Sequence, residues 1–145
     1  MAAELDRAHV ELVERFYRAF DDGAIPDALT LFAQDLETID PGMGTVHGIP
    51  PFREYLETLK RAVPDAQARI DQLHDAGNAV VVEGRFVGTF TGPLATPEGD
   101  VEPTGASVEL RFADVSTVED GRIVAYHTYY DQLGLLTQLG LMTDS

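Results

Sequence analysis

The fold is decided by residues 106–131, which read ASVELRFADVSTVEDGRIVAYHTYYD. Polar and apolar side chains alternate on both sides of Glu119-Asp120-Gly121, and a Gly-containing turn between two such stretches predicts a β-hairpin. Residues 66–91 repeat the pattern around a turn at residues 75–78. The second half of the chain therefore predicts two long antiparallel hairpins, separated by a Pro- and Gly-rich loop over residues 92–104.

Helices are predicted for the N-terminal third of the chain. Apolar residues recur at helical spacing over residues 5–20, and prolines at first-turn positions open shorter helices over residues 26–32 and 50–63. Residues 36–40 alternate and predict a short strand. Residues 132–142 predict either a short terminal helix or an ordered tail, because two glycines weaken the helix.

The order of these elements predicts the fold class. Helices followed by antiparallel strands indicate an α+β fold, in which helices pack on one face of a strongly curved sheet and enclose a cone-shaped pocket. The length of 145 residues suits a single domain over residues 1–145, and no linker or repeat divides it. Gly84, Gly88 and Gly92 are predicted to bend the long strands.

Composition limits the classes of function. The chain has no Cys, so disulfides, thiolate metal sites and cysteine nucleophiles are excluded. A net charge of −15 repels phosphate backbones and anionic lipids, so we expect neither nucleic acid nor a membrane as a partner. With no secretory leader and no apolar stretch of membrane length, we expect a cytoplasmic protein. The histidines lack metal-ligand spacings, and no metal is expected.

Residues 122–131 hold the first candidates for chemistry. Strict alternation places His127, Tyr129 and Asp131 on one face of the predicted strand. If this face points inward, Asp131 becomes a buried carboxylate beside His127, an arrangement suited to proton transfer. The competing interpretation is that Asp131 caps the terminal segment and that His127 is a hydrogen-bonded histidine without a chemical role.

A second group of candidates comes from other elements. Asp40 ends the predicted short strand as a second acid or base, while Phe16 and Tyr17 lie on the first helix as ligand-binding candidates. Arg111 shares a face with Glu109 and could form an ion pair inside the pocket. The alternatives are turn chemistry for Asp40, core packing for Tyr17 and solvent exposure for the strand charges.

Short signatures follow one another along nearly the whole chain. In order, they are Phe16-Tyr17-Arg18-Ala19-Phe20, His47-Gly48, Val63-Pro64-Asp65, Gly88-Thr89-Phe90-Thr91-Gly92, Pro103-Thr104-Gly105, Asp120-Gly121-Arg122-Ile123, Tyr130-Asp131-Gln132 and Gln138-Leu139-Gly140. Together they resemble the polyketide-cyclase-like (SnoaL-like) and ester-cyclase-like proteins of the nuclear transport factor 2-like (NTF2-like) superfamily. The resemblance implies a homodimer of cone-shaped subunits, each with a cofactor-free site. It also implies that Asp131 is the general acid/base of an intramolecular aldol cyclisation, with His127 and Tyr129 as pocket neighbours.

Two other branches of this superfamily resemble the chain less completely. Tyr17 and Asp40 are similar in placement to the phenolic donor and the carboxylate base of ketosteroid isomerases. The further oxyanion-hole acid of those enzymes falls near Ala113 by an ungapped count back from the hairpin turn. Limonene-epoxide-hydrolase-like members use an Arg flanked by two carboxylates, and Arg111 has Ala113 where that arrangement needs an acid. Alanine cannot donate a hydrogen bond, which weakens both alternatives.

The sequence therefore predicts a cofactor-free enzyme of the polyketide-cyclase-like type. Its acid/base catalysis would cyclise or isomerise a small, largely apolar carbonyl compound, and Asp131 and Asp40 favour this hypothesis. The alternative is a non-catalytic protein of the same fold that binds a small ligand, because a fold does not fix a function.

Overall fold

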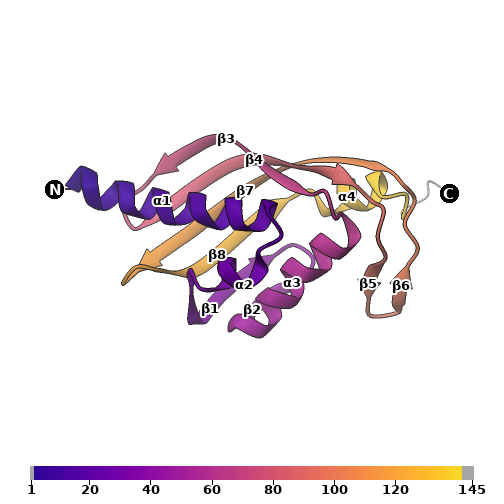
Figure 1. Ribbon diagram of the computed structural model, residues 1–145, viewed down its shortest axis with the longest axis horizontal. Coiled ribbons are helices and arrows are strands. Elements are labelled where there is room, and N and C mark those ends of the chain that lie inside the picture. The colour runs from indigo at the N-terminus through magenta and orange to yellow at the C-terminus, as the bar shows by residue number, and fades with distance from the viewer. Residues whose placement is uncertain (1, 142–145) are drawn as a thin grey trace.

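The computed structural model describes residues 2–141, with side chains from residue 8 onward, and confirms the α+β fold (Figure 1). The helices are α1 (Ala2–Asp21), α2 (Ile25–Leu29), α3 (Ile49–Ala62) and α4 (Gln132–Gln138). The strands are β1 (Phe32–Asp40), β2 (Gly44–His47), β3 (Gln67–Asp75), β4 (Ala79–Thr89), β5 (Leu94–Thr96), β6 (Gly99–Val101), β7 (Ser107–Glu119) and β8 (Arg122–Tyr130).

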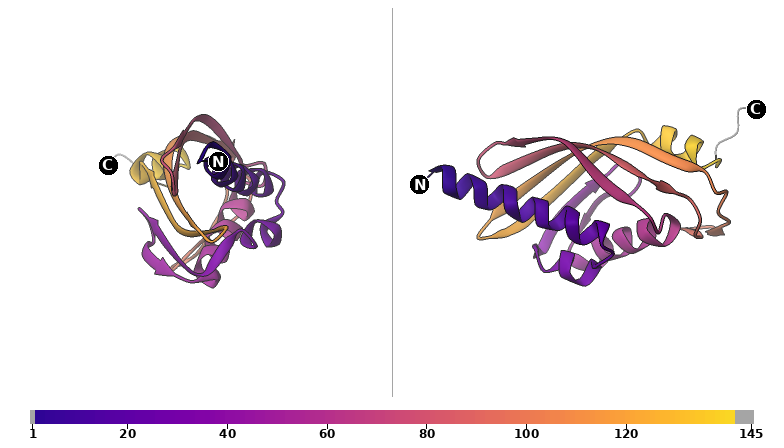
Figure 2. Two further views of the ribbon diagram at one scale, coloured as in Figure 1. Left: turned by 90° about the vertical axis from the view of Figure 1, so that its left-hand side faces the viewer. Right: turned by 45° about the horizontal axis from the view of Figure 1, so that its top comes forward.

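The main sheet is mixed and has the strand order β2-β1-β8-β7-β4-β3. Strands β1 and β8 run parallel, whereas the other neighbours are antiparallel. The long strands curve around α1 and α3, which lie along one face of the sheet (Figure 2). We call this face the inner face and the opposite one the outer face. The small β5–β6 hairpin extends beyond the main sheet, at the end where α4 lies (Figure 1).

The hairpin predicted from residues 106–131 is confirmed. Asp120 and Gly121 both have positive φ, at 51° and 75°. Positive φ at both central residues is the geometry of a type I′ turn, whose twist matches that of the flanking strands. The turn therefore fixes the antiparallel pairing of β7 with β8, on which the site depends.

Glycines in and after β4 allow a helix to approach the sheet closely. A Cβ added at Gly88 would overlap the Val63 side chain, and one added at Gly92 would overlap the Arg61 carbonyl oxygen. Residues 61–63 form the C-terminal end of α3 and its cap. The missing Cβ atoms let this end of α3 rest directly on the strand, which closes one side of the fold.

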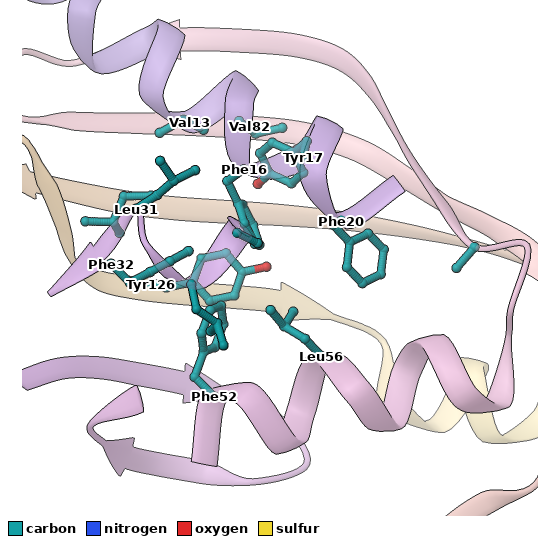
Figure 3. Close-up of a cluster of buried hydrophobic side chains, with 14 of the residues drawn as sticks. Val13, Phe16, Tyr17, Phe20, Leu31, Phe32, Phe52, Leu56, Val82 and Tyr126 are labelled. Atoms are coloured by element: carbon teal, nitrogen blue, oxygen red, sulfur yellow. The ribbon is translucent and has the colours of Figure 1, made fainter. Parts of the chain in front are cut away.

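The core lies between the helices and the inner face of the sheet. Four aromatic rings pack together, with ring centroids between 4.6 and 6.3 Å apart (Figure 3). They belong to Phe16 of α1, Phe32 of β1, Phe52 of α3 and Tyr126 of β8. These aromatic rings join four elements that are distant in the chain. Aromatic side chains bury large areas and favour tilted contacts of this kind, so the cluster fixes α1 and α3 against the sheet.

Some predicted boundaries need correction. The second helix ends at Leu29 and β1 begins at Phe32, so this strand is longer than residues 36–40. Strand β2 and the β5–β6 hairpin were not predicted, because short strands depend on cross-strand neighbours that are not visible locally. The C-terminal segment forms a helix up to residue 138, and residue 142 of the predicted segment lies outside the described residues. Among the described helices, none has the length and apolar character that a membrane crossing requires.

Candidate active site

A pocket of about 310 Å³ lies between α1, α3, α4 and the inner face of the sheet. Its apolar lining includes Phe16, Phe20, Leu56, Leu59, Phe86, Leu94, Leu110, Phe112, Leu135, Leu136 and Leu139. Its polar lining includes Tyr17, Asp40, Tyr55, Thr58, Asp114, Tyr126, Thr128, Tyr130 and Gln132. A concave, mostly apolar surface with a few convergent polar groups is typical of a small-molecule site.

Asp114 is the most deeply buried charged residue of this pocket. It projects from β7 with only 1% of its surface exposed. Its Oδ2 atom accepts hydrogen bonds from the Tyr17 hydroxyl at 2.6 Å and the Tyr126 hydroxyl at 2.8 Å. These tyrosines come from α1 and β8 and lie in the same buried cluster (Figure 3). The Oδ1 atom is also buried and accepts no hydrogen bond of ordinary geometry, although the Thr128 hydroxyl lies near the carboxyl group, so Oδ1 can meet a ligand.

Burial changes the protonation of Asp114. Desolvation raises the pKa of its carboxyl to about 6, against the lowering effect of the Thr128, Tyr17 and Tyr126 hydroxyls, and Asp40 raises it further. The group therefore titrates close to neutral pH. Because Oδ2 already accepts two hydroxyls, the proton belongs on Oδ1. In its acid form, Asp114 presents a hydrogen-bond donor to the pocket.

Asp40 is a second buried carboxylate in the same pocket. It is the last residue of β1 and only 3% exposed. Its Oδ2 atom accepts hydrogen bonds from the backbone N–H groups of Gly42 at 2.7 Å and Met43 at 3.0 Å. This turn chemistry fixes the carboxylate and leaves the buried Oδ1 atom without a partner. Asp40 therefore serves the turn with one oxygen and offers the other to a ligand.

Two further tyrosines surround Asp40. Burial raises the pKa of Tyr55 well above its ordinary value, and the neighbouring Asp40 carboxylate adds to this effect. Burial followed by the charge of Asp40 likewise raises the pKa of Tyr130. Both phenols therefore keep their protons at neutral pH and can act as hydrogen-bond donors.

The structure places Asp131 outside the pocket and corrects its predicted inward orientation. Asp131 is the N-cap of α4, where its Oδ1 atom accepts a hydrogen bond from the Gly134 backbone N–H at 2.9 Å. The side chain is exposed. A carboxylate in this position stabilises the first turn of a helix and does not face the pocket.

Three other predicted site residues lie on the outer face of the sheet, and their predicted inward orientation is corrected in the same way. The His127 Nε2 atom is 2.8 Å from Glu37 Oε1. Tyr129 is 52% exposed, and Arg111 is exposed as well. Since Arg111 points away from the pocket, the epoxide-hydrolase-like arrangement has no basis in this structure. Phe16, Tyr17 and Asp40, in contrast, line the pocket.

An irregularity in β8 separates these two groups of residues. Thr117 pairs with Ala125 and Val118 pairs with Ile123, so Val124 is an extra residue in the strand. The extra residue interrupts the alternation, and both Ile123 and Tyr126 are buried. An uninterrupted strand with Ile123 inward would also have turned Asp131 inward, so the bulge decides which residues of β8 reach the pocket.

Sequence reasoning missed Asp114 by one position. The ungapped count placed the isomerase-like acid at Ala113, whose neighbour Asp114 carries the carboxylate and points inward. A local signal was present, because Asp114 shares its parity in the strand with the buried Val108, Leu110 and Val118. The pattern of an acidic residue on the apolar face of a predicted strand predicts a buried acid, and it was the available clue.

Within the part of the chain that the structure describes, no three His, Asp or Glu side chains are grouped so that they could hold a metal ion. The pocket instead combines two carboxylates with phenolic hydroxyls and an apolar wall. This donor set can move protons and bind oxygen atoms of an organic ligand.

Comparison with known families agrees with this fold. The sequence model of the SnoaL-like domain matches residues 13–126. The chain belongs to this family. The matched region of this SnoaL-like protein runs from α1 to β8 and includes both buried aspartates. No curated protein sequence matches the chain.

Solved structures share the fold of this SnoaL-like protein. A protein from Jannaschia sp. CCS1, provisionally described as a SnoaL-like polyketide cyclase, is 22% identical, with 96% of each chain covered and a TM-score of 0.83. AclR from Streptomyces galilaeus, provisionally described as a hydroxylase, is 18% identical, with 99% of this chain and 89% of AclR covered and a TM-score of 0.78. A protein from Pseudomonas putida KT2440, provisionally described as a polyketide cyclase, is 22% identical, with 90% and 97% covered and a TM-score of 0.73. At these identities the likeness shows the NTF2-like fold alone.

Proposed function

We propose that this SnoaL-like protein is a cofactor-free enzyme that moves a proton at a carbon atom beside the carbonyl group of a small, largely apolar compound. One observation carries the proposal. The Oδ1 atoms of Asp40 and Asp114 are both buried, both unpartnered and both in side chains that line one pocket. Buried polar atoms without partners are rare and often mark a functional site. Here they supply a base and an acid to the same ligand.

Asp40 is the proposed base. Its ionised Oδ1 atom takes the proton from the carbon beside the carbonyl group, and the electron pair of that C–H bond forms a C=C bond. The carbonyl π electrons move to the oxygen atom, which becomes an enolate oxygen. The backbone N–H groups of Gly42 and Met43 hold the other carboxylate oxygen, so the base keeps its orientation during the transfer.

Asp114 is the proposed donor to the enolate oxygen. The proton on its Oδ1 atom forms a hydrogen bond to this oxygen, while Tyr17 and Tyr126 polarise the acid through their bonds to Oδ2. A carboxylic acid kept neutral by an apolar site is a strong donor for such an oxyanion, as in ketosteroid isomerases. With Asp40 as the base, Asp114 as the donor and Tyr17 bound to Asp114, the pocket contains the acid that the sequence count did not find.

Two outcomes are open to the enolate. If the compound also has a C=C bond conjugated with the enolate, return of the proton from Asp40 to the far end of this conjugated system re-forms the carbonyl group, shifts the C=C bond and gives an isomerised product. Attack of the enolate carbon on a second carbonyl group of the same molecule forms a C–C bond and restores the first carbonyl group. The new alkoxide then takes the proton that Asp40 received, which completes an aldol cyclisation. The apolar lining favours either course, because it excludes water that would compete for the enolate.

Proton exchange tests the proposal without knowledge of the natural substrate. Small neutral ketones in D₂O are incubated with the protein, and deuterium uptake beside the carbonyl group is followed by NMR. We expect exchange above the buffer rate. We also expect it to weaken as the pH rises through the pKa of Asp114, about 6, because the donor then loses its proton. Ketones that bind without exchange would overturn the enzyme proposal and favour the small-ligand-binding protein.

We also propose that the chain forms a homodimer through the outer face of the sheet. On this face, a row of paired residues crosses the neighbouring strands β4, β7 and β8 and consists of Val81, Val115 and His127. The exposed Tyr129 lies on the same face. A second copy would cover this partly apolar row. Light scattering should give twice the monomer mass, and Val115→Glu should give monomers. A monomeric native protein at high concentration would contradict the proposal.

A further inference from the structure

We propose that the same pocket binds ligands that carry an organic ammonium group, held between the carboxylates of Asp40 and Asp114. The inference rests on the proposed function in that it assigns a ligand class to the same site. The ligand is a small protonated amine with an apolar body. Such a compound is either a substrate that also bears the reacting carbonyl group or a competitor of a neutral substrate.

The first argument is the balance of charge inside the pocket. Asp40 and Asp114 contribute two carboxyl groups, and no Lys, Arg or His is among the described residues that line it. Each carboxyl group keeps one buried oxygen without a partner. An ionised carboxylate in apolar surroundings is costly unless a positive charge or hydrogen-bond donors compensate it. An ammonium group supplies the positive charge that the pocket wall lacks, and its N–H donors add to the neighbouring hydroxyls.

The second argument is the aromatic content of the wall. The rings that line the pocket are those of Phe16, Tyr17, Phe20, Tyr55, Phe86, Phe112, Tyr126 and Tyr130. The face of an aromatic ring attracts a cation, and the attraction grows where water is excluded. The rings also accommodate the apolar body of the ligand. The wall therefore favours an organic cation over an inorganic one.

The third argument concerns the groups that face Asp114. These are Tyr17 of α1, Tyr126 and Thr128 of β8, and the more distant Asp40 of β1. The charge of Asp114 also contributes to the raised pKa of Tyr55 of α3. All of these groups are neutral or negative, so ionisation of Asp114 leaves a negative charge that only the hydroxyls moderate. Because Asp114 ionises near pH 6, the pocket attracts a cation more strongly above this pH.

This dependence on pH is opposite to that of the proposed reaction. The enolate donor requires protonated Asp114, whereas an ammonium ligand favours the ionised form. Exchange with neutral ketones should therefore weaken as the pH rises, while ammonium binding should strengthen. The two proposals can fail independently, because one is tested by turnover of a neutral compound and the other by the affinity of a cation.

The experiment compares two probes of nearly the same shape. Phenethylammonium carries the charge, and 2-phenylethanol replaces it with a hydroxyl group. Calorimetry at about pH 8 should show at least about tenfold tighter binding of phenethylammonium to the native protein. The advantage should shrink at about pH 5, where Asp114 is mostly protonated.

Variants identify the groups that hold the cation. Asp114→Asn and Asp40→Asn should each remove most of the preference for phenethylammonium while 2-phenylethanol still binds, which shows that the pocket is intact. Asp131→Asn removes the same charge outside the pocket and should leave the preference unchanged. Equal or tighter binding of the alcohol to the native protein overturns the inference, as does an affinity for phenethylammonium that is independent of pH.

Discussion

Strand β8 carries a polar contact on each face, and the two contacts have the same length. On the inner face, the Tyr126 hydroxyl donates to Asp114 at 2.8 Å. On the outer face, the neighbouring His127 Nε2 lies 2.8 Å from Glu37. The Glu37 side chain is 42% exposed, whereas Asp114 is 1% exposed. Water screens the outer pair, while burial shifts the protonation of the inner carboxyl group, so burial and not pairing makes the inner contact a candidate for chemistry.

The largest difference between the faces should appear in turnover. Asp40→Asn removes the proposed base without a change of shape and should lower the rate of proton exchange by about a thousandfold. Asp131→Asn changes an exposed helix cap and should keep the rate within about twofold of the native protein, since that carboxylate does not reach the pocket. The rates are measured by deuterium uptake into a neutral ketone. Equal losses in the two variants would remove Asp40 from the proposed role.

A second difference should appear in the pH dependence of stability. Burial raises the pKa of Asp114 from its ordinary value of 3.8 to about 6, so the folded protein keeps this proton where the unfolded chain has released it. The native protein therefore loses about 2 kcal/mol of stability, relative to Asp114→Asn, as the pH rises from about 4 to about 7.

Urea unfolding of both proteins across this range measures the effect. Glu37→Gln on the outer face serves as the control and should show a much smaller change, because an exposed pair contributes little. Native and Asp114→Asn stability curves that run parallel would contradict the buried state of this carboxyl group.

Two tyrosines of β8 provide a matched pair for the hydrogen bonds. Tyr126→Phe removes one hydroxyl from Asp114 and should lower the free energy of unfolding by about 1 to 2 kcal/mol, because a buried acceptor loses a donor. Tyr129→Phe removes an exposed hydroxyl and should change it by less than about 0.5 kcal/mol. Chemical unfolding at one pH measures both. A larger loss from Tyr129→Phe would reverse the assignment of the two faces.

The smallest effect is expected for the outer histidine. His127→Gln keeps a hydrogen-bonding side chain beside Glu37 and should change the free energy of unfolding by less than about 0.5 kcal/mol. It should leave ketone exchange unchanged, because His127 does not line the pocket. If this variant unfolds at the same temperature as the native protein but clearly loses exchange, the outer face takes part in the reaction.

Half of the candidate site could be predicted from local patterns. Tyr17 lies on the apolar stripe of α1 and Asp40 ends β1, and the structure places both in the pocket wall. Their roles stay predictions. Asp114 was visible as an acid on the apolar face of β7, but a count without gaps missed it by one residue. His127 and Asp131 could not be oriented, because the extra Val124 in β8 has no local signature.

The sequence by itself determined the elements and their order. Helical spacing, alternation and the Asp120-Gly121 turn act within a few residues, so they can be recognised along the chain. Only the tertiary structure decided which side chains meet. Asp114 and Tyr17 are 97 residues apart, and their contact depends on how α1 packs across the sheet and on the register of β7 with β8. Register and packing arise from contacts between distant segments, and a shift of one residue turns each side chain of a strand to the opposite face.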